Sequence, residues 1–294
     1  MQTLGERIST TELLPIAART TTVGTYGSAV IDRVEKDSSR VILHSAASSA
    51  GTGVSLAVKM QESDAAGAGS FDNRSGTEVA VELRKGSNDN IKLAAKVTQS
   101  GARQVKSVFL RLKNVGTIAS GKTVTVTLET DSSGDPSGTA IHADATATVL
   151  CSSIDSSFDW VEFELTRPVD IADTTVFHIV LSGNYTESSS NYIAWATETV
   201  GSGGDFNIFD SAWGGVSSTT AAMGYIEEYN FSDISGAAFT AVDETAGSFQ
   251  ELDVELSERK RYLRALATVT GTSASFQCGA HIILGNAAER HVSG

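Results

Sequence analysis

The stretch LDVELSERKRYLRALATVTGTSASFQCGAHIILG, residues 252–285, decides the fold class of this chain. Apolar and polar side chains alternate along it with a period of two, which is typical of strands that bury one face. The charged residues 258–261 and the run Gly271-Thr272-Ser273 interrupt the alternation and are typical of turns. The stretch therefore predicts three consecutive antiparallel strands, whose buried positions are Leu252, Val254 and Leu256; Leu263, Ala265, Ala267 and Val269; and Phe276, Cys278, Ala280, Ile282 and Leu284.

Such a small group of strands needs further strands to bury its apolar face, because an isolated hairpin is marginally stable in water. The matching pattern lies near the other end of the chain, in residues 28–61. There SAVIDRV, RVILHSA and GVSLAVKMQ follow one another, and Val54, Leu56, Val58 and Met60 share one face of the last run. We therefore expect the two ends of the chain to form one domain, with the middle of the chain inserted into it.

Three segments of these two ends resemble a known family. They are VSLAVKMQESD (54–64), KRYLRA (260–265) and IILG (282–285). The pattern resembles the head decoration or auxiliary capsid proteins of tailed bacteriophages. The resemblance implies a structural virion protein on the outer surface of the head, bound to the major capsid protein or other virion proteins. It carries no catalytic signature.

The composition favours an all-β protein. The chain has 294 residues with 27 glycines and only 3 prolines, and short alternating runs recur along it. The predicted fold is all-β: a discontinuous antiparallel β-sandwich domain with an inserted jelly-roll β-sandwich.

We place the domain boundaries where the alternation stops and restarts. Residues 1–27 are interpreted as an N-terminal arm that docks on a neighbour, with a loosely ordered terminus as the alternative. Residues 28–104 plus 230–294 are predicted to form the discontinuous virion-attachment domain, with a glycine-rich loop at 62–76. Alternation restarts at Val105 after the polar stretch 98–104, so residues 105–229 are predicted to be the insertion.

The predicted insertion resembles the jelly-roll modules of carbohydrate-binding and cell-surface proteins. The resemblance rests on four segments, TDSSGDPSGT (130–139), WVEFEL (160–165), VFHIVL (176–181) and YIAW (192–195). It implies a β-sandwich. No binding residue is carried over, because loops at matching places hold different chemistry in different modules.

Net charge limits the partners. The chain carries a formal charge of -13 with a pI near 4.8, which argues against nucleic-acid binding because phosphate contacts need clustered Lys and Arg. The charge suits a solvated surface or docking onto a more basic partner such as a capsid shell. No apolar run approaches the roughly 18 residues of a membrane span, and the N-terminus lacks a signal peptide pattern. We expect synthesis in the host cytoplasm, release within the virion and no membrane partner.

The sequence gives little support for catalysis, so we predict a protein that is not an enzyme and has no metal or other cofactor. There is no GxSxG motif and the five histidines are scattered. The carboxylate pairs Glu162/Glu164 and Asp253/Glu255 suit a solvated sheet face, although glycosidase pairs are recognised by geometry alone. The loop 131–138 offers oxygens to calcium, but a tight hairpin turn explains it better. Both cysteines, Cys151 and Cys278, are predicted to be small buried side chains.

The segment VGSGGDFNIFDSAWGGV (200–216) is the strongest candidate for a ligand site. Aromatic faces there could stack on sugar rings while neighbouring amide and carboxylate groups bind hydroxyls. The candidate glycan-binding residues are Asn207, Phe209, Asp210 and Trp213. The alternative is that the aromatic side chains fold back over the sandwich core. Trp160 and Trp195 lie within predicted strands and are expected in the core.

Two functions compete. The first is a capsid decoration or auxiliary protein that displays the inserted sandwich outward and binds the shell non-covalently, with self-association into a homo-oligomer left open. The second is a carbohydrate-binding spike or adhesin that recognises a host surface polysaccharide. A hydrolase acting on a cell-surface polymer is a third and weaker interpretation.

Overall fold

The computed structural model describes residues 8–20, 25–34, 36–86, 90–186 and 188–285. The prediction of an all-β fold is confirmed, since every helical position in these residues belongs to one short 3-10 turn at Cys151–Ser153. The paired strands run antiparallel throughout, for example β22 (Tyr262–Thr270) against β5 (Ser55–Ser63). None of the described segments is a helix long and apolar enough to cross a membrane.

The chain divides into two compact units, residues 1–65 with 230–294 and residues 66–229. The expected boundary at 104/105 is therefore wrong, because residues 66–104 belong to the insertion. The reason is strand pairing: β6 (Gly67–Asn73), β7 (Val79–Leu83) and β8 (Lys92–Thr98) each pair with a strand of the second unit. The glycine-rich loop expected at 62–76 contains β6 for the same reason.

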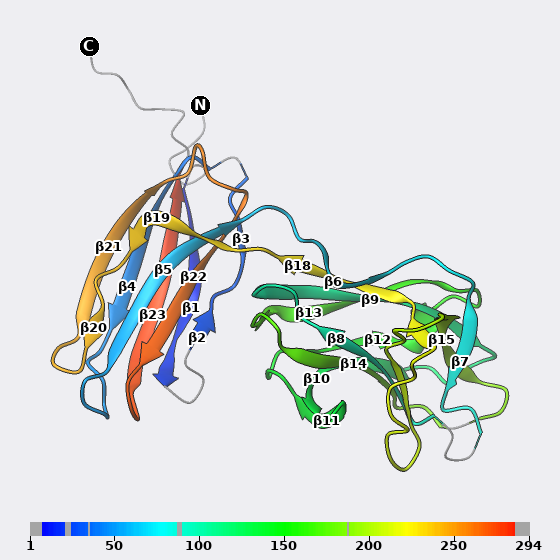
Figure 1. Ribbon diagram of the computed structural model, residues 1–294. Helices are drawn as coiled ribbons and strands as arrows, with labels where there is room; N and C mark the ends of the chain where they lie inside the picture. The colour runs from blue at the N-terminus through cyan, green and yellow to red at the C-terminus, as the bar shows by residue number, and fades with distance from the viewer. Residues whose placement is uncertain (1–7, 21–24, 35, 87–89, 187, 286–294) are drawn as a thin grey trace, which may run out of the picture. The chain divides into compact units, whose positions relative to one another are not determined.

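Unit 1, residues 1–65 with 230–294, consists of two sheets around one core (Figure 1). The first sheet has the order β1 (Ile8–Thr20), β23 (Ser275–Gly285), β4 (Ser38–Ser45) and β21 (Ser248–Glu255). The second has the order β19 (Ser232–Ala238), β5, β22 and β2 (Thr25–Gly27), with β20 (Val242–Asp243) beside β5 and β3 (Ile31–Asp32) beside β22. Both sheets contain strands from both ends of the chain, as the sequence predicted.

The three predicted strands of residues 252–285 are present, but they do not pair with one another. β21 and β23 both flank β4 in the first sheet, whereas β22 lies in the second sheet beside β5. The two turns thus connect opposite layers. Gly271 helps the second turn, since its φ of 98° is in the left-handed region that favours glycine. The alternation of apolar and polar residues predicted which side of each strand is buried, but it did not predict which of the two sheets the strand joins.

The expected N-terminal arm is also corrected, because Ile8–Thr20 of it forms β1 at the edge of the first sheet and Thr25–Gly27 forms β2 in the second. β1 pairs with β23, and the register shifts between Glu12 and Leu14. A bulge of this kind lets two successive side chains point inward, and Leu13 and Leu14 are 0% and 1% exposed. Residues 1–7 and 21–24 of the expected arm lie outside the described residues.

Unit 2, residues 66–229, is a larger two-sheet sandwich with its own core. One sheet has the order β11 (Asp135–Ala140), β10 (Thr123–Ser132), β14 (Val176–Gly183), β8 and β16 (Phe206–Phe209), with β12 (Thr146–Leu150) also beside β10. The other has the order β17 (Thr220–Ala222), β15 (Tyr192–Thr199), β9 (Arg103–Val115), β18 (Gly224–Tyr229) and β6, with β13 (Asp159–Ile171) beside β9 and β7 beside β15.

The largest fully buried side chains of unit 2 are Trp195, Phe163 and Phe177, all 0% exposed. Trp195 is in the core as predicted. Trp160 is not, since it lies half-buried on the outer side of β13. Cys151 and Cys278 are buried free thiols as predicted, one in the core of each unit.

Candidate functional site

Three of the four candidate glycan-binding residues meet at one edge of unit 2. Phe209 ends β16 and forms an isolated bridge with Trp213, and their rings lie edge to face with centroids 5.1 Å apart. The ammonium of Lys92 lies 5.7 Å from the centre of the Phe209 ring. Asp210 accepts a hydrogen bond of 2.6 Å from the backbone N–H of Asn90, so its carboxylate ties this turn to the segment that precedes β8. Both aromatic rings are half-buried.

Asn207, the fourth candidate, is not available to a ligand. It is 1% exposed, and its amide donates a hydrogen bond of 2.8 Å to Asp135. The carbonyl oxygen of the same side chain accepts from the backbone N–H of Ile208. The prediction of Asn207 as a binding residue is therefore wrong: the β10–β11 hairpin carries Asp135 over it.

The alternative that loop aromatics cover the core applies to Phe206. This side chain is 2% exposed and lies edge to face with Trp195 at 5.4 Å. Next to it, Asp205 accepts a hydrogen bond from the backbone N–H of Ala222. Loss of hydration on burial raises the pKa of Asp205 to about 6.

The loop 131–138 is a hairpin whose carboxylates are used internally. Asp131 lies 2.9 Å from Nε2 of His178, a side chain that is 0% exposed, and accepts from the backbone N–H of Gly134. The hydrogen bond to His178 holds the pKa of Asp131 below its ordinary value. Among the residues that the structure describes, no group of three or more His, Cys, Asp or Glu side chains is arranged to hold a metal ion.

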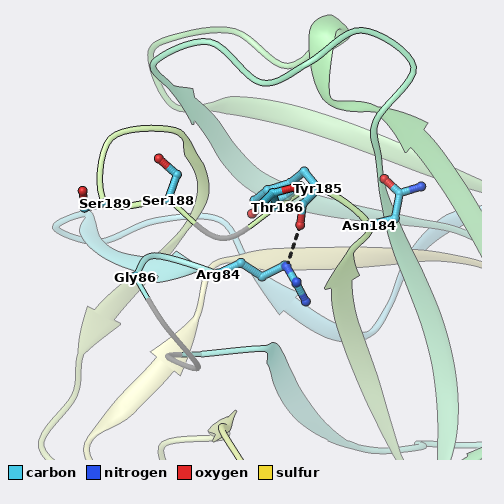
Figure 2. A pocket seen from close by; sticks show the side chains of 7 residues that line it. All are labelled: Arg84, Gly86, Asn184, Tyr185, Thr186, Ser188 and Ser189. Carbon is cyan, nitrogen blue, oxygen red and sulfur yellow. Dashed lines mark hydrogen bonds between the residues drawn. The ribbon is translucent and has the colours of Figure 1, made fainter.

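One polar pocket of unit 2, about 660 Å³ in volume, was not anticipated from the sequence. Figure 2 shows that the Arg84 side chain reaches the backbone of Tyr185, and its Nε donates a hydrogen bond of 2.9 Å to the Tyr185 carbonyl. The Tyr185 hydroxyl in turn donates a hydrogen bond to the Leu83 carbonyl and accepts one from the backbone N–H of Ile193. These groups hold the loop together, and we assign the pocket no ligand. It is lined by Arg84, Gly86, Asn184, Tyr185, Thr186, Ser188 and Ser189.

A second unanticipated feature is an aromatic cluster on the outer face of the β9 sheet. Phe109 and Tyr225 stack with centroids 4.4 Å apart, and the edge of Trp160 approaches Tyr225 at 5.3 Å. The guanidinium of Arg74 lies 4.7 Å from the Tyr225 ring centre, and that of Arg111 lies 5.4 Å from Trp160. The ring faces are thus largely engaged with one another and with arginines. A signal for Trp160 existed in WVEFEL, because Trp160 has the opposite phase to the inward-pointing Phe163 and Leu165, but the expectation that Trp160 lies in the core did not use it.

Unit 1 presents the most exposed large apolar side chains of the described residues. Ile16 on β1 is 63% exposed and Phe249 on β21 is 60% exposed. Both lie on the outer face of the first sheet, one on each edge strand. For Phe249 a signal existed in the sequence, since it alternates in step with Glu251 and Asp253. Ile16 lies where the register of β1 shifts, so the local sequence pattern does not predict that its side chain is exposed.

Comparison with known proteins gives no family assignment. No protein-family model matches the chain, and no curated protein matches it. Among solved structures, the VP2 subviral particle of infectious bursal disease virus is similar with 9% identity, covering 95% of this chain and 79% of that chain at a TM-score of 0.22. The Gx strain of the same virus gives 7% identity, 95% and 78% coverage and a TM-score of 0.18. Likeness at these TM-scores carries no argument about this chain.

Proposed function

We propose that this chain is a structural virion protein of a tailed bacteriophage, a decoration or auxiliary protein of the head shell. The observation that carries the proposal is that unit 2 is inserted into a loop of unit 1. The backbone N–H of Asn230 donates a hydrogen bond of 3.1 Å to the Ser63 hydroxyl, so the chain leaves and re-enters unit 1 at one place. Such an insertion suits one unit to attachment and the other to display. The resemblance of segments 54–64, 260–265 and 282–285 to head decoration proteins supports the same function.

In this proposal the protein acts by binding and performs no chemical step. A protein that binds only the assembled shell stabilises it by mass action. Repetition of the contact over a symmetric shell adds avidity to each weak contact. The proposed partner is therefore the major capsid protein in its assembled form.

The proposal is tested with heads of the phage that encodes the chain, produced from a genome lacking this gene. Purified protein is added to the heads, and sedimentation measures the bound copies per head. We expect saturable binding and a higher temperature of head disruption after addition. Heads that bind no protein, or binding without a defined stoichiometry, would contradict the proposal.

A second candidate function is recognition of a host surface glycan by unit 2. The observation that favours it is the meeting of Phe209, Trp213 and Lys92 beside the edge strand β16, where both rings are half-buried. Glycan-array binding should be lost on Trp213→Ala and retained on Trp160→Ala, which removes the other half-buried tryptophan of the same unit. Equal binding by both variants would reject this edge as the site.

A further inference from the structure

The outer face of the first sheet of unit 1 carries an unusual row of side chains across all four strands. Gly279 is the register partner of His44, and His44 is the register partner of Phe249. The Ile16 side chain covers Gly279, with its Cγ1 2.6 Å from the point where a Cβ of residue 279 would stand. The His44 ring lies edge to face with Phe249 at 4.7 Å. We call these four residues the Ile16–Phe249 row.

The next rows along the strands widen the apolar centre. Half-buried Ile42 is the register partner of His281, whose ring centroid is 6.4 Å from that of His44. Half-buried Ile283 follows on the same face, beside Arg40. The central strands therefore present two isoleucine and two imidazole side chains, while Phe249 and Ile16 lie on the edge strands and Ile16 covers Gly279.

Acidic side chains lie on both edge strands of this face. Glu12 lies on β1 opposite His281, and Glu251 lies on β21 opposite Ile42. Asp253 and Glu255 continue β21 on the same side. The one cation of these rows, Arg40, is bound to Asp253 at 2.7 Å and to Glu251 at 3.3 Å. Four carboxylates, three on β21 and one on β1, thus lie at the edges of a face that holds a single guanidinium.

A sheet face with these properties is typical of an interaction surface, because soluble proteins rarely leave large apolar side chains this exposed in one group. Four strands with the usual spacings give a face of about 15 by 25 Å. That is roughly half of the 800 Å² that one partner contributes to a standard stable interface. A contact of this size is weak alone and effective when repeated.

We propose that this face is the docking surface of unit 1, and that its occupant is a shell surface with an apolar ridge flanked by Lys and Arg. The inference rests on the proposed function and names the residues that perform it. Charge decides between two occupants. A second copy of this chain would bring like carboxylates together, whereas a basic flank on the partner complements them and steers the encounter. The exposed Phe249 and Ile16 are the anchors.

The test compares the double variant Ile16→Ser/Phe249→Ser with Leu150→Ser in binding to heads that lack the chain. Leu150 is the matched control because it is 49% exposed and lies in unit 2. We expect at least tenfold weaker binding for the double variant and a change within twofold for the control. Near-UV circular dichroism and an unchanged melting temperature establish that the double variant is folded. A second pair, Glu12→Gln/Glu251→Gln against Glu164→Gln, should show weaker binding only for the first.

The outcomes separate the two proposals. If wild-type protein binds heads and the double variant binds equally well, this docking face is wrong while the proposed function stands. If wild-type protein does not bind heads, the proposed function fails and takes the docking face with it. If sedimentation velocity shows a dimer of the wild-type protein that the double variant loses, the face is an interface between copies, and the basic occupant is wrong.

Discussion

The backbone N–H of Asn230 donates a hydrogen bond of 3.1 Å to the hydroxyl of Ser63, although the two residues are 167 positions apart in the chain. The next residues continue the contact, since Ser232 pairs with Glu62 where β19 meets β5. The insertion therefore begins and ends at neighbouring points of a completed sandwich. Unit 1 has its own core, whose described residues all come from 1–65 and 230–294.

We predict that unit 1 folds without unit 2. Replacing residues 66–229 by a short Gly/Ser linker should give a monomer with cooperative thermal unfolding and a β-type circular dichroism spectrum, because the linker spans only the gap that this hydrogen bond already closes. Urea unfolding of this variant is followed by far-UV circular dichroism, because all three tryptophans lie in unit 2 and the variant has no tryptophan fluorescence. A non-cooperative melt would contradict the prediction.

The buried side chains of Leu13 and Leu14 on β1 should stabilise unit 1. An N-terminal arm that only docks on a neighbour would contribute nothing to this core. Leu14→Ala should lower the free energy of unfolding by about 2–5 kcal/mol, because it opens a cavity next to β23. Ile16→Ala on the same strand should change it by less than about 0.5 kcal/mol, since Ile16 is exposed. Chemical denaturation of both variants measures the difference. Equal small effects would show that β1 is not part of the core.

Asp205 should make unit 2 less stable as pH rises. Its folded pKa of about 6 lies above the ordinary value of 3.8, so its contribution is fully present below pH 3.8 and is lost as pH rises through about 6. Asp205→Asn should therefore stabilise the protein by about 1–2 kcal/mol at pH 7.5, within the limit of roughly 3 kcal/mol that the two pKa values set. At pH 4 the variant and wild type should match. Destabilisation by the variant at pH 7.5 would contradict the assignment.

The partly buried contact between Asp131 and His178 should hold the β10–β11 hairpin in place. Asp131→Asn should cost about 1–3 kcal/mol, because the fully buried imidazole loses its charged partner. The lowered pKa of Asp131 gives the sign of the pH effect: its stabilisation is present above the ordinary value of 3.8 and is lost as pH falls through the lower folded pKa. Ser132→Ala, exposed in the same hairpin, should be nearly neutral. Similar losses for both variants would attribute the effect to the hairpin backbone.

Local alternation in the sequence determined which side chains of a strand face the core. Val54, Leu56, Val58 and Met60 are at most 2% exposed. From Phe276 to Leu284 every second position is buried, and Gly279 is buried as well. Strict alternation along this strand also predicts that Trp160 faces away from the core, because it lies an odd number of residues from the buried Phe163 and Leu165. Composition likewise fixed the all-β class and the buried state of both cysteines.

Only the tertiary structure decided which strands pair. β21, β22 and β23 have similar patterns, yet β22 lies in the other sheet; β6, with the sequence GAGSFDN, is a strand because β18 pairs with it. Asn207 is buried because Asp135, far away in the chain, lies against it. The physical reason is that side-chain direction follows from the geometry of neighbouring residues, whereas layer, register and coverage depend on hydrogen bonds and packing between segments distant in sequence. The outer face with Ile16 and Phe249 at its edges belongs to this second kind.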